Sequence, residues 1–177
     1  MAIVDRMMRA AKGDVNLFEE VEHDPSATTE ALIVVVIVAL AGGIGGALAT
    51  AGSRPGGLIG AVIGAVISAL LGWAVFAGVT YFVGTRLFKG EATWEEVLRT
   101  LGYAYSPNVL QIVVFIPIVG WLVALIAGLW GLYLSFIGIR AALDISSGQT
   151  IGTILISIIP TIIIVAIVRA PFALMGM

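Results

Sequence analysis

The chain has 177 residues, of which 60% are hydrophobic and only 11% are charged, and it contains no cysteine. Soluble domains carry about a quarter charged residues, so this composition excludes an ordinary soluble domain, and the lack of cysteine excludes disulfides and thiolate chemistry. A bilayer crossing needs about 20 apolar residues, and four uncharged stretches are long enough: 31–53, 55–85, 100–139 and 145–168. The sequence therefore predicts an all-α polytopic membrane protein.

Residues 1–30 form the most charged part of the chain and lack the apolar run of a signal peptide. Between residues 2 and 12, apolar side chains recur at helical spacing beside basic ones. We expect an amphipathic helix in the headgroup region that stops at Gly13, and a helix packed on the protein's own loops fits equally well. Residues 14–30 carry six acids and no base. We expect them to form a solvated acidic linker, although Leu17, Phe18 and Val21 share a helical spacing.

Residues 31–177 are predicted to form one transmembrane domain with five transmembrane helices. Four of these spans are expected at about 31–51, 58–82, 119–140 and 151–168, the last interrupted by Pro160. The uncharged run from Tyr103 to Ile139 is too long for one span, and Pro117 and Gly120 mark the expected turn. The piece before this turn, 103–116, fits either a short tilted span or a re-entrant hairpin.

Residues 91–102 are predicted to form an interfacial amphipathic helix. Thr93 and Glu96 have the spacing of a capping box, and Trp94 begins an apolar stripe and is expected to anchor the helix at headgroup depth. Arg140 and Asp144, four residues apart at the end of the fourth span, are expected to pair as a second interfacial anchor.

Basic residues are distributed unevenly between the two sides of the predicted membrane domain. Seven Lys and Arg residues fall on the N-terminal side and two on the other, whichever alternative holds for 103–116. The positive-inside rule therefore predicts a cytoplasmic N-terminus. The charge count does not determine on which side of the membrane the C-terminus lies.

A row of small residues follows the second span at intervals of four. Small residues allow transmembrane helices to approach closely, so this row is predicted to dock against another helix, within the chain or between chains. Gly42 and Gly46 of the first span offer a matching surface. The row consists of Gly56, Gly60, Gly64, Ser68 and Gly72.

One cluster of polar residues interrupts the apolar sequence after residue 102. Asn108 and Gln111 are three apart and share a helical face. The favoured interpretation is that these side chains satisfy backbone groups loosened by Pro107, and the alternative is a polar recess beneath the headgroups that binds a lipid headgroup or a partner. The cluster consists of Tyr103, Tyr105, Ser106, Asn108 and Gln111.

Catalytic and metal-binding motifs are missing from the sequence. The single histidine, His23, lies in the acidic segment and is expected to be solvated, and no metal-ligand or phosphate-loop spacing occurs. We therefore expect no enzymatic activity, no cofactor, no metal and no nucleic-acid partner.

Three blocks of the sequence resemble bacterial members of the Yip-one (Ypt-interacting protein) family. They read "NLFEEVEHDPSATTEAL", "FKGEATWEEVLRTLGYAYSPNVL" and "FIPIVGWLVALIAGLWGLYLSFIGIRAALDISSGQTI", and the resemblance covers about residues 15–170. It implies five spans with a cytoplasmic N-terminus. Eukaryotic relatives associate with Rab-type GTPases, but this chain lacks their long N-terminal region and its D-L-Y-G-P motif, so GTPase binding is not expected here.

Three functional interpretations follow from the sequence. The first is a non-enzymatic accessory or scaffold protein of a prokaryotic plasma membrane that packs against itself or a larger membrane complex. The second is a small transporter or lipid-binding protein with its site near Asn108 and Gln111. The third is a membrane-shaping protein that uses helices at 2–12 and 91–102.

Overall fold

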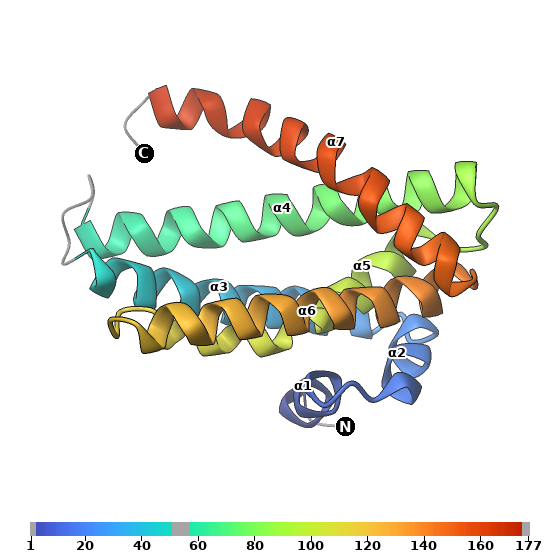
Figure 1. The fold of residues 1–177 in the computed structure, drawn as a ribbon, viewed down its shortest axis with the longest axis horizontal. Helices are drawn as coiled ribbons and strands as arrows, with labels where there is room; N and C mark the ends of the chain where they lie inside the picture. Colours follow the sequence, from blue (N-terminus) through green and yellow to red (C-terminus); the bar gives the residue numbers. More distant parts are fainter. Residues whose placement is uncertain (1–2, 51–56, 175–177) are drawn as a thin grey trace.

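The computed structural model describes residues 3–50 and 57–174, which form eight helical elements (Figure 1). Long helices run side by side along the long axis of the molecule, and short N-terminal helices pack at one side of this bundle. The elements are α1 (Ile3–Ala11), α2 (Val15–Glu22), α3 (Ala27–Ala49), α4 (Gly57–Leu87), α5 (Trp94–Ala104), the 3₁₀ helix η1 (Ser106–Val113), α6 (Val119–Leu143) and α7 (Ser147–Leu174).

In the described part of the chain, four helices are long and apolar enough to cross a membrane, namely α3, α4, α6 and α7. Helices α4, α6 and α7 contain their predicted spans and extend beyond them, whereas α3 begins four residues before the predicted 31–51 and ends at Ala49. Helix α7 passes through Pro160 without interruption, so the expected break there is wrong. Proline removes one backbone hydrogen bond but is tolerated in apolar transmembrane helices, where nearby groups and local adjustments satisfy the freed carbonyl.

The segment between α4 and α6 does not form the re-entrant hairpin that was one of the two forms expected for 103–116. Helix α5 ends at Ala104, η1 follows, and the turn before α6 contains Ile118 with φ 66°. The chain does not double back within this segment. It runs parallel to α3, because Gly102 lies against Ala31 near one end and Gly45 lies against the carbonyl of Ile112 near the other.

Helix α5 is packed inside the protein along most of its length, so the solvent-exposed polar face expected for it is absent beyond the first turn of this described helix. The capping box of Thr93 and Glu96 is confirmed, but every residue from Val97 to Ala104 is buried. Arg99 lies on the polar side of the predicted helix and donates to the backbone carbonyls of Val21 and Glu22. Helix α2 therefore covers the face that was expected to meet solvent.

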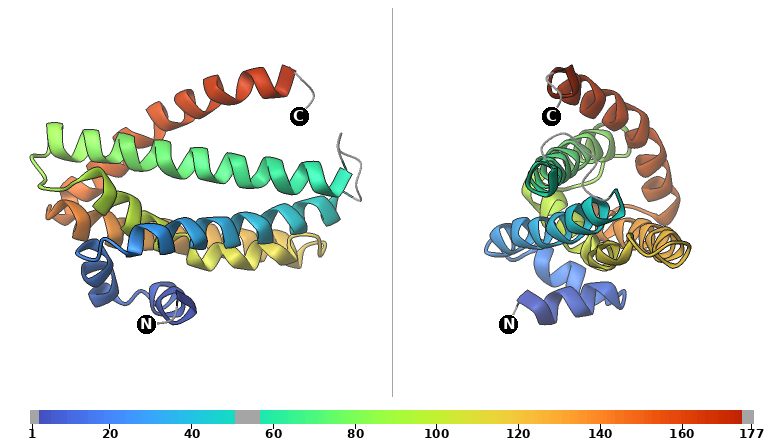
Figure 2. Two further views of the ribbon diagram at one scale, coloured as in Figure 1. Left: turned by 180° about the vertical axis from the view of Figure 1, so that it is seen from behind. Right: turned by 90° about the vertical axis from the view of Figure 1, so that its left-hand side faces the viewer.

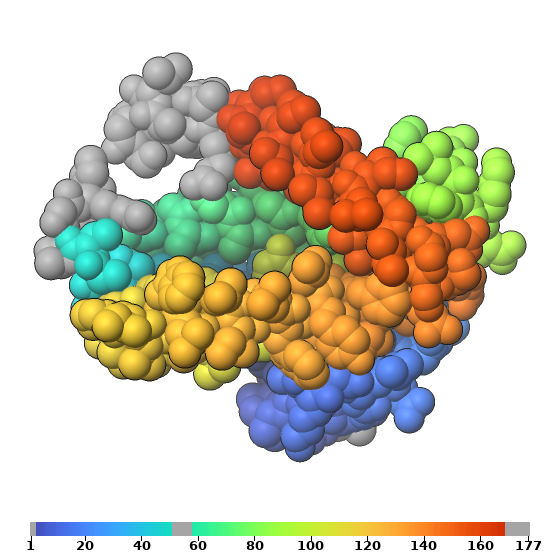
Figure 3. All heavy atoms as spheres, viewed as in Figure 1, coloured from blue at the N-terminus to red at the C-terminus, as the bar shows by residue number. Residues whose placement is uncertain are grey.

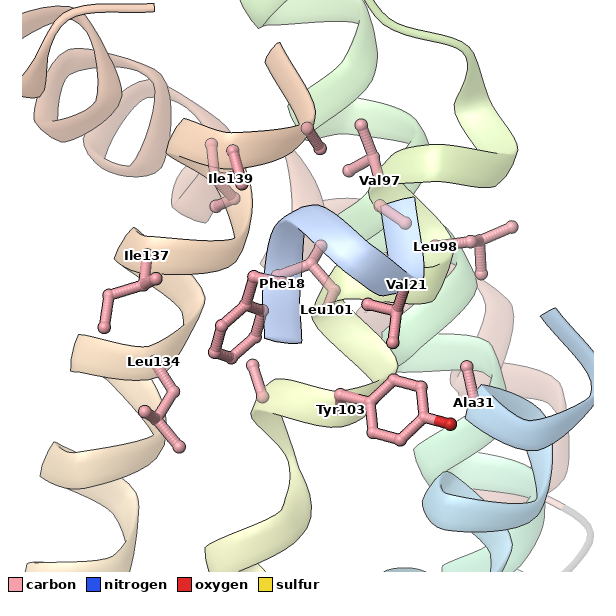
Figure 4. Close-up of a cluster of buried hydrophobic side chains, with 14 of the residues drawn as sticks. Phe18, Val21, Ala31, Val97, Leu98, Leu101, Tyr103, Leu134, Ile137 and Ile139 are labelled. Atoms are coloured by element: carbon pink, nitrogen blue, oxygen red, sulfur yellow. The ribbon is translucent and has the colours of Figure 1, made fainter. Parts of the chain in front are cut away.

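Helix α2 replaces most of the predicted solvated linker. Its N-terminus is capped by Asp14, and Leu17, Phe18 and Val21 are completely buried. Figure 4 shows Phe18 and Val21 pointing into the cluster formed with side chains of α5 and α6. Burying a large apolar side chain contributes about 1.5–3 kcal/mol, which explains why this acidic segment folds onto the bundle.

Helix α1 lies across the bundle instead of along it (Figure 2). Gly13 ends the helix as expected, with φ 75°. Ile3 and Met7 pack toward the core, whereas Val4 and Met8 are 58% and 51% exposed. The helix is thus packed on its own protein and presents a second, apolar edge outward.

Candidate functional site

The predicted docking row of α4 has no neighbour within the described chain. A Cβ atom built on Gly64 or Gly72 meets nothing within 4 Å, and Gly60 is exposed. Ser68 is partly exposed, and Gly56 lies outside the described residues. The row is therefore not a helix contact inside this chain.

Close backbone contacts involve other glycines of α3 instead. A Cβ on Gly43 would lie 2.9 Å from the Cβ of Ala65 and 3.1 Å from the Cα of Val62, so this glycine allows α3 and α4 to touch. Of the two predicted glycines, Gly42 faces the side chain of Gln111 and Gly46 meets nothing within 4 Å.

A cleft of about 520 Å³ lies between α4 and α6, with α3 and the α5–η1 segment as its floor. Figure 3 shows the hollow between α4, α6 and α7 from the side, and Figure 2 shows α7 diverging from α6 along its length. Ligand pockets commonly measure about 300–1,000 Å³. The cleft is lined by Val38, Ala39, Gly42, Gly43, Ala65, Ala69, Phe76, Ala104, Tyr105, Asn108, Gln111, Gly128, Gly131, Leu132 and Ser135.

Four of the lining side chains are polar and none is charged. The Gln111 Nε2 donates to the Asn108 Oδ1 at 3.0 Å, so the pair predicted from its spacing is confirmed. The Ser135 hydroxyl donates to the Gly131 carbonyl, 2.8 Å away. No hydrogen bond from Asn108 or Gln111 to a backbone group is observed in the described structure, which disfavours the interpretation that they repair the backbone at Pro107.

Only part of the predicted polar cluster reaches the cleft. Tyr105, Asn108 and Gln111 line it. The Tyr103 hydroxyl instead donates to Glu30 at 2.5 Å, and the Ser106 hydroxyl donates to the Tyr103 carbonyl at 2.6 Å. Ser135 of α6 is an additional polar lining residue.

The Asn108–Gln111 pair lies near the middle of the α3 span. The side chain of Gln111 packs against Gly42, which follows Glu30, the last charge before the apolar run, by twelve residues. At 1.5 Å per residue this corresponds to about 18 Å, in a hydrocarbon core about 30 Å thick. The polar groups therefore lie beside the central part of the apolar run of α3.

Arg6 organises the N-terminal helices through a cluster of three carboxylates. Its guanidinium contacts Glu20 at 3.1 Å, Asp24 at 2.9 Å and Glu30 at 2.9 Å, and only 10% of its side chain is exposed. Glu30 also accepts the Tyr103 hydroxyl. One arginine thus joins α1, α2, α3 and α5.

Arg9 continues this network on the same helix. It contacts Asp14 and Glu20, both at 2.8 Å, and its hydrogen bonds hold the pKa of Glu20 and of Asp14 below their ordinary values. The basic face of α1 and the acidic segment therefore neutralise each other. Arg6 and Arg9 are occupied internally, and these acids do not point into solvent as expected.

Trp130 of α6 fixes the end of α1 and was missed by sequence reasoning. Its Nε1 donates to the Ala11 carbonyl at 2.7 Å, and its ring lies 5.1 Å from that of Tyr133. A tryptophan in an apolar helix is normally interpreted as a lipid-facing residue, so the sequence alone does not reveal this contact.

Glu22 is a buried carboxyl without a charge partner at the end of α2. The residue is 5% exposed, and its Oε2 has no hydrogen-bond partner in the described structure. Burial raises the pKa of Glu22 to about 7, with the neighbouring carboxylates Glu19, Glu96 and Asp144 acting in the same direction.

The predicted interfacial anchors lie near this end of the molecule. Trp94 is 42% exposed. Arg140 and Asp144 are both exposed, but no ion pair between them occurs among the described residues, because α6 ends at Leu143 and Asp144 turns into the left-handed region with φ 50°. His23 is exposed with its ring bonded to the Glu19 carbonyl, and residues 3–50 and 57–174 contain no group of three potential metal ligands.

A second cavity, of about 440 Å³, adjoins α7 and is lined by Thr161, Ile162, Val165 and Ala166. Closer to the start of α7, the hydroxyls of Thr153 and Ser157 are fully buried without a hydrogen-bond partner in the described chain, as is that of Thr80 in α4. The Thr161 hydroxyl, which lines the second cavity, is likewise without a partner in the described chain and follows Thr153 and Ser157 at intervals of four residues. Thr161 is the one polar residue of that lining, whereas the cleft has four, so the cleft is the stronger candidate site.

Comparison with known families gives one match. A family model described as the Yip1 domain matches residues 15–170. No curated protein and no solved structure matches the chain.

Proposed function

Because the chain belongs to the Yip1 domain family and has four helices suited to a bilayer, we propose that it is a non-enzymatic membrane protein that binds an amphiphilic lipid in the cleft. The observation that carries this proposal is a mid-depth cleft of about 520 Å³ with an amide pair on its floor. Polar groups at membrane depth are costly and mark binding sites or pathways. The cleft and its amide pair support the expectation of a binding site near Asn108 and Gln111.

The lateral position of the cleft favours lipid over a water-soluble solute. Its walls are α4 and α6, and α7 moves away from α6 toward its C-terminal end (Figure 2). A lipid reaches such a cleft from the bilayer without crossing the headgroup region. Phe76, Leu132 and Val38 offer apolar contacts to its chains.

The proposal includes an arrangement in the membrane. The α5–η1 segment passes along α3 from one end toward the other, and we infer that it supplies a third crossing, which makes five. The excess of basic residues, seven against two, supports a cytoplasmic N-terminus. A prokaryotic plasma membrane is the location inferred from the resemblance to bacterial family members, with Trp94 and Arg140 at the cytoplasmic interface.

A matched pair of glycines tests the lipid-binding proposal. Gly128 lines the cleft and Gly64 faces outward from α4, and a Cβ on either meets nothing within 4 Å. Gly128→Leu should fill the cleft without a clash, whereas Gly64→Leu should leave it open. The full chain is purified from its membranes in mild detergent, and co-purified lipid is extracted and quantified by mass spectrometry.

We expect the amount of one co-purified lipid species to be at least tenfold lower in Gly128→Leu than in wild type, and to be unchanged in Gly64→Leu. Equal lipid profiles for the wild type and Gly128→Leu, with both proteins folded, would contradict the proposal.

An accessory or scaffold role is the second candidate, and the uncovered row of α4 favours it. Gly60, Gly64 and Gly72 leave this helix face open to close approach by a transmembrane helix of a second copy or of a larger membrane complex. Gly60→Leu combined with Gly64→Leu should dissociate that assembly, measured as mass in mild detergent. An unchanged assembly would exclude docking at this row.

A further inference from the structure

We propose that the cleft selects a lipid with an uncharged hydroxyl head, of the diacylglycerol class, over lipids with a phosphate headgroup. This inference rests on the proposed lipid-binding function and names the chemical class of its ligand. The observations that carry it are the charge of the lining, the hydrogen-bonding capacity of the amide pair and its depth.

The lining supplies no cation for a phosphate. Its polar members are one tyrosine, two amides and one serine. The nearest buried cation of the N-terminal helices, Arg6, is already held by Glu20, Asp24 and Glu30. Glu30 precedes Val38, the first α3 residue of the cleft, by eight residues, or about 12 Å along the helix. A phosphate in the cleft would therefore lose its hydration without gaining an ion pair, which strongly disfavours its entry.

The amide pair lines the cleft and has one donor and one acceptor that its internal hydrogen bond leaves unused. Asn108 uses its oxygen to accept from Gln111, which leaves the Asn108 amino group as a donor and the Gln111 carbonyl oxygen as an acceptor. A hydroxyl both donates and accepts, so it satisfies both groups at once. The phosphodiester and quaternary ammonium of phosphatidylcholine supply no donor, so that headgroup leaves the Gln111 oxygen without a partner. A phosphatidylglycerol head has hydroxyls but brings a charged phosphodiester with them, which the uncharged lining disfavours.

The depth of the pair fits a small head. The lipid must carry its polar end about 18 Å from Glu30, near the middle of the hydrocarbon core. A single hydroxyl beside two uncharged esters has a much smaller desolvation cost at that depth than an ion. Diacylglycerol has this chemistry and resides in the bilayer, from which the cleft opens.

The test compares three lipids with identical oleoyl chains: dioleoylglycerol, dioleoylphosphatidylglycerol and dioleoylphosphatidylcholine. The full chain is delipidated in mild detergent and incubated with equal mole fractions of all three, and bound lipid is counted by native mass spectrometry. Gln111→Leu removes the free acceptor and the bond to Asn108, Gly128→Leu fills the cleft, and Gly64→Leu serves as the matched control.

We expect wild type and Gly64→Leu to bind dioleoylglycerol at least tenfold more than either phospholipid, and Gln111→Leu and Gly128→Leu to lose that preference. If a phospholipid binds wild type as well as dioleoylglycerol does, and Gly128→Leu abolishes its binding, the preference for an uncharged hydroxyl head is wrong but lipid binding in the cleft is supported. If no lipid binds wild type more than Gly128→Leu, both the inference and the proposed function fail.

Discussion

Replacement of Arg6 by methionine should release α1 and α2 from the bundle while the long helices stay folded. The substitution keeps an apolar side chain of similar length and removes a guanidinium that contacts three carboxylates. Breaking a buried ion pair by removing one partner costs about 3–5 kcal/mol. The side chains of these three acids are 26–36% exposed, so water partly restores their solvation, and we expect a loss of about 2–3 kcal/mol.

Hydrogen exchange of the full chain in mild detergent measures this loss locally. Because 1.4 kcal/mol corresponds to a factor of ten, the protection factors of the α1 and α2 amides should fall by roughly 30- to 150-fold. Lys12→Met is the control, because Lys12 is exposed in the turn directly after α1 and forms no ion pair within the described residues. Protection of α1 in Arg6→Met within threefold of wild type would refute the view that the Arg6 cluster holds these helices.

Three further predictions concern single contacts. Burial raises the pKa of Glu22 from its ordinary 4.5 to about 7, so the neutral carboxyl favours the docked α2 at low pH and this contribution is lost as the pH rises toward 7. The amides of α2 should therefore be better protected from exchange in Glu22→Gln than in wild type at pH 8, but not at pH 4.5. Equal protection of the two proteins at both pH values would contradict this. Gly43→Ala should destabilise the protein by about 1–3 kcal/mol through overpacking against Ala65 and Val62, whereas Gly64→Ala, which meets nothing, should be neutral or slightly stabilising in a thermal unfolding assay. Trp130→Phe removes the hydrogen bond to the Ala11 carbonyl, worth about 0.5–1.5 kcal/mol, and should increase exchange at the end of α1 without affecting α7.

The positions of the four long helices could be predicted because lipid imposes simple length and polarity requirements. An uncharged run of sufficient length has one favourable structure in a bilayer, a helix that satisfies its own backbone. The same reasoning left two forms open for 103–116, because this piece is short for a span, and it did not predict the 3₁₀ helix η1, in which only Ser106 and Pro107 are buried. Whether a short apolar segment contacts protein or lipid depends on residues distant in sequence, such as Gly45 against Ile112.

The N-terminal region shows a different limit of sequence reasoning. The spacing of Leu17, Phe18 and Val21 carried the correct signal, but the surrounding acids favoured a solvated linker. These acids are stabilised by two arginines that lie 5–24 residues away in the chain, from Arg9–Asp14 to Arg6–Glu30. Charge patterns interpreted one segment at a time cannot show that a basic helix and an acidic segment are partners, although their opposite charges were visible in the sequence.

The small residues of this chain serve two physical purposes that their spacing does not distinguish. Gly43 and Gly45 bring backbones into contact, since a Cβ on either would meet neighbouring atoms at 2.9 Å or less. Gly128 lines the cleft with nothing near its Cβ position, and Gly42 faces only the side chain of Gln111. Larger side chains at these two positions would occupy the space above the amide pair. Because a polar floor at membrane depth is costly when it faces only hydrocarbon, glycines that keep access to it open are better explained by a ligand with matching polar groups than by helix packing.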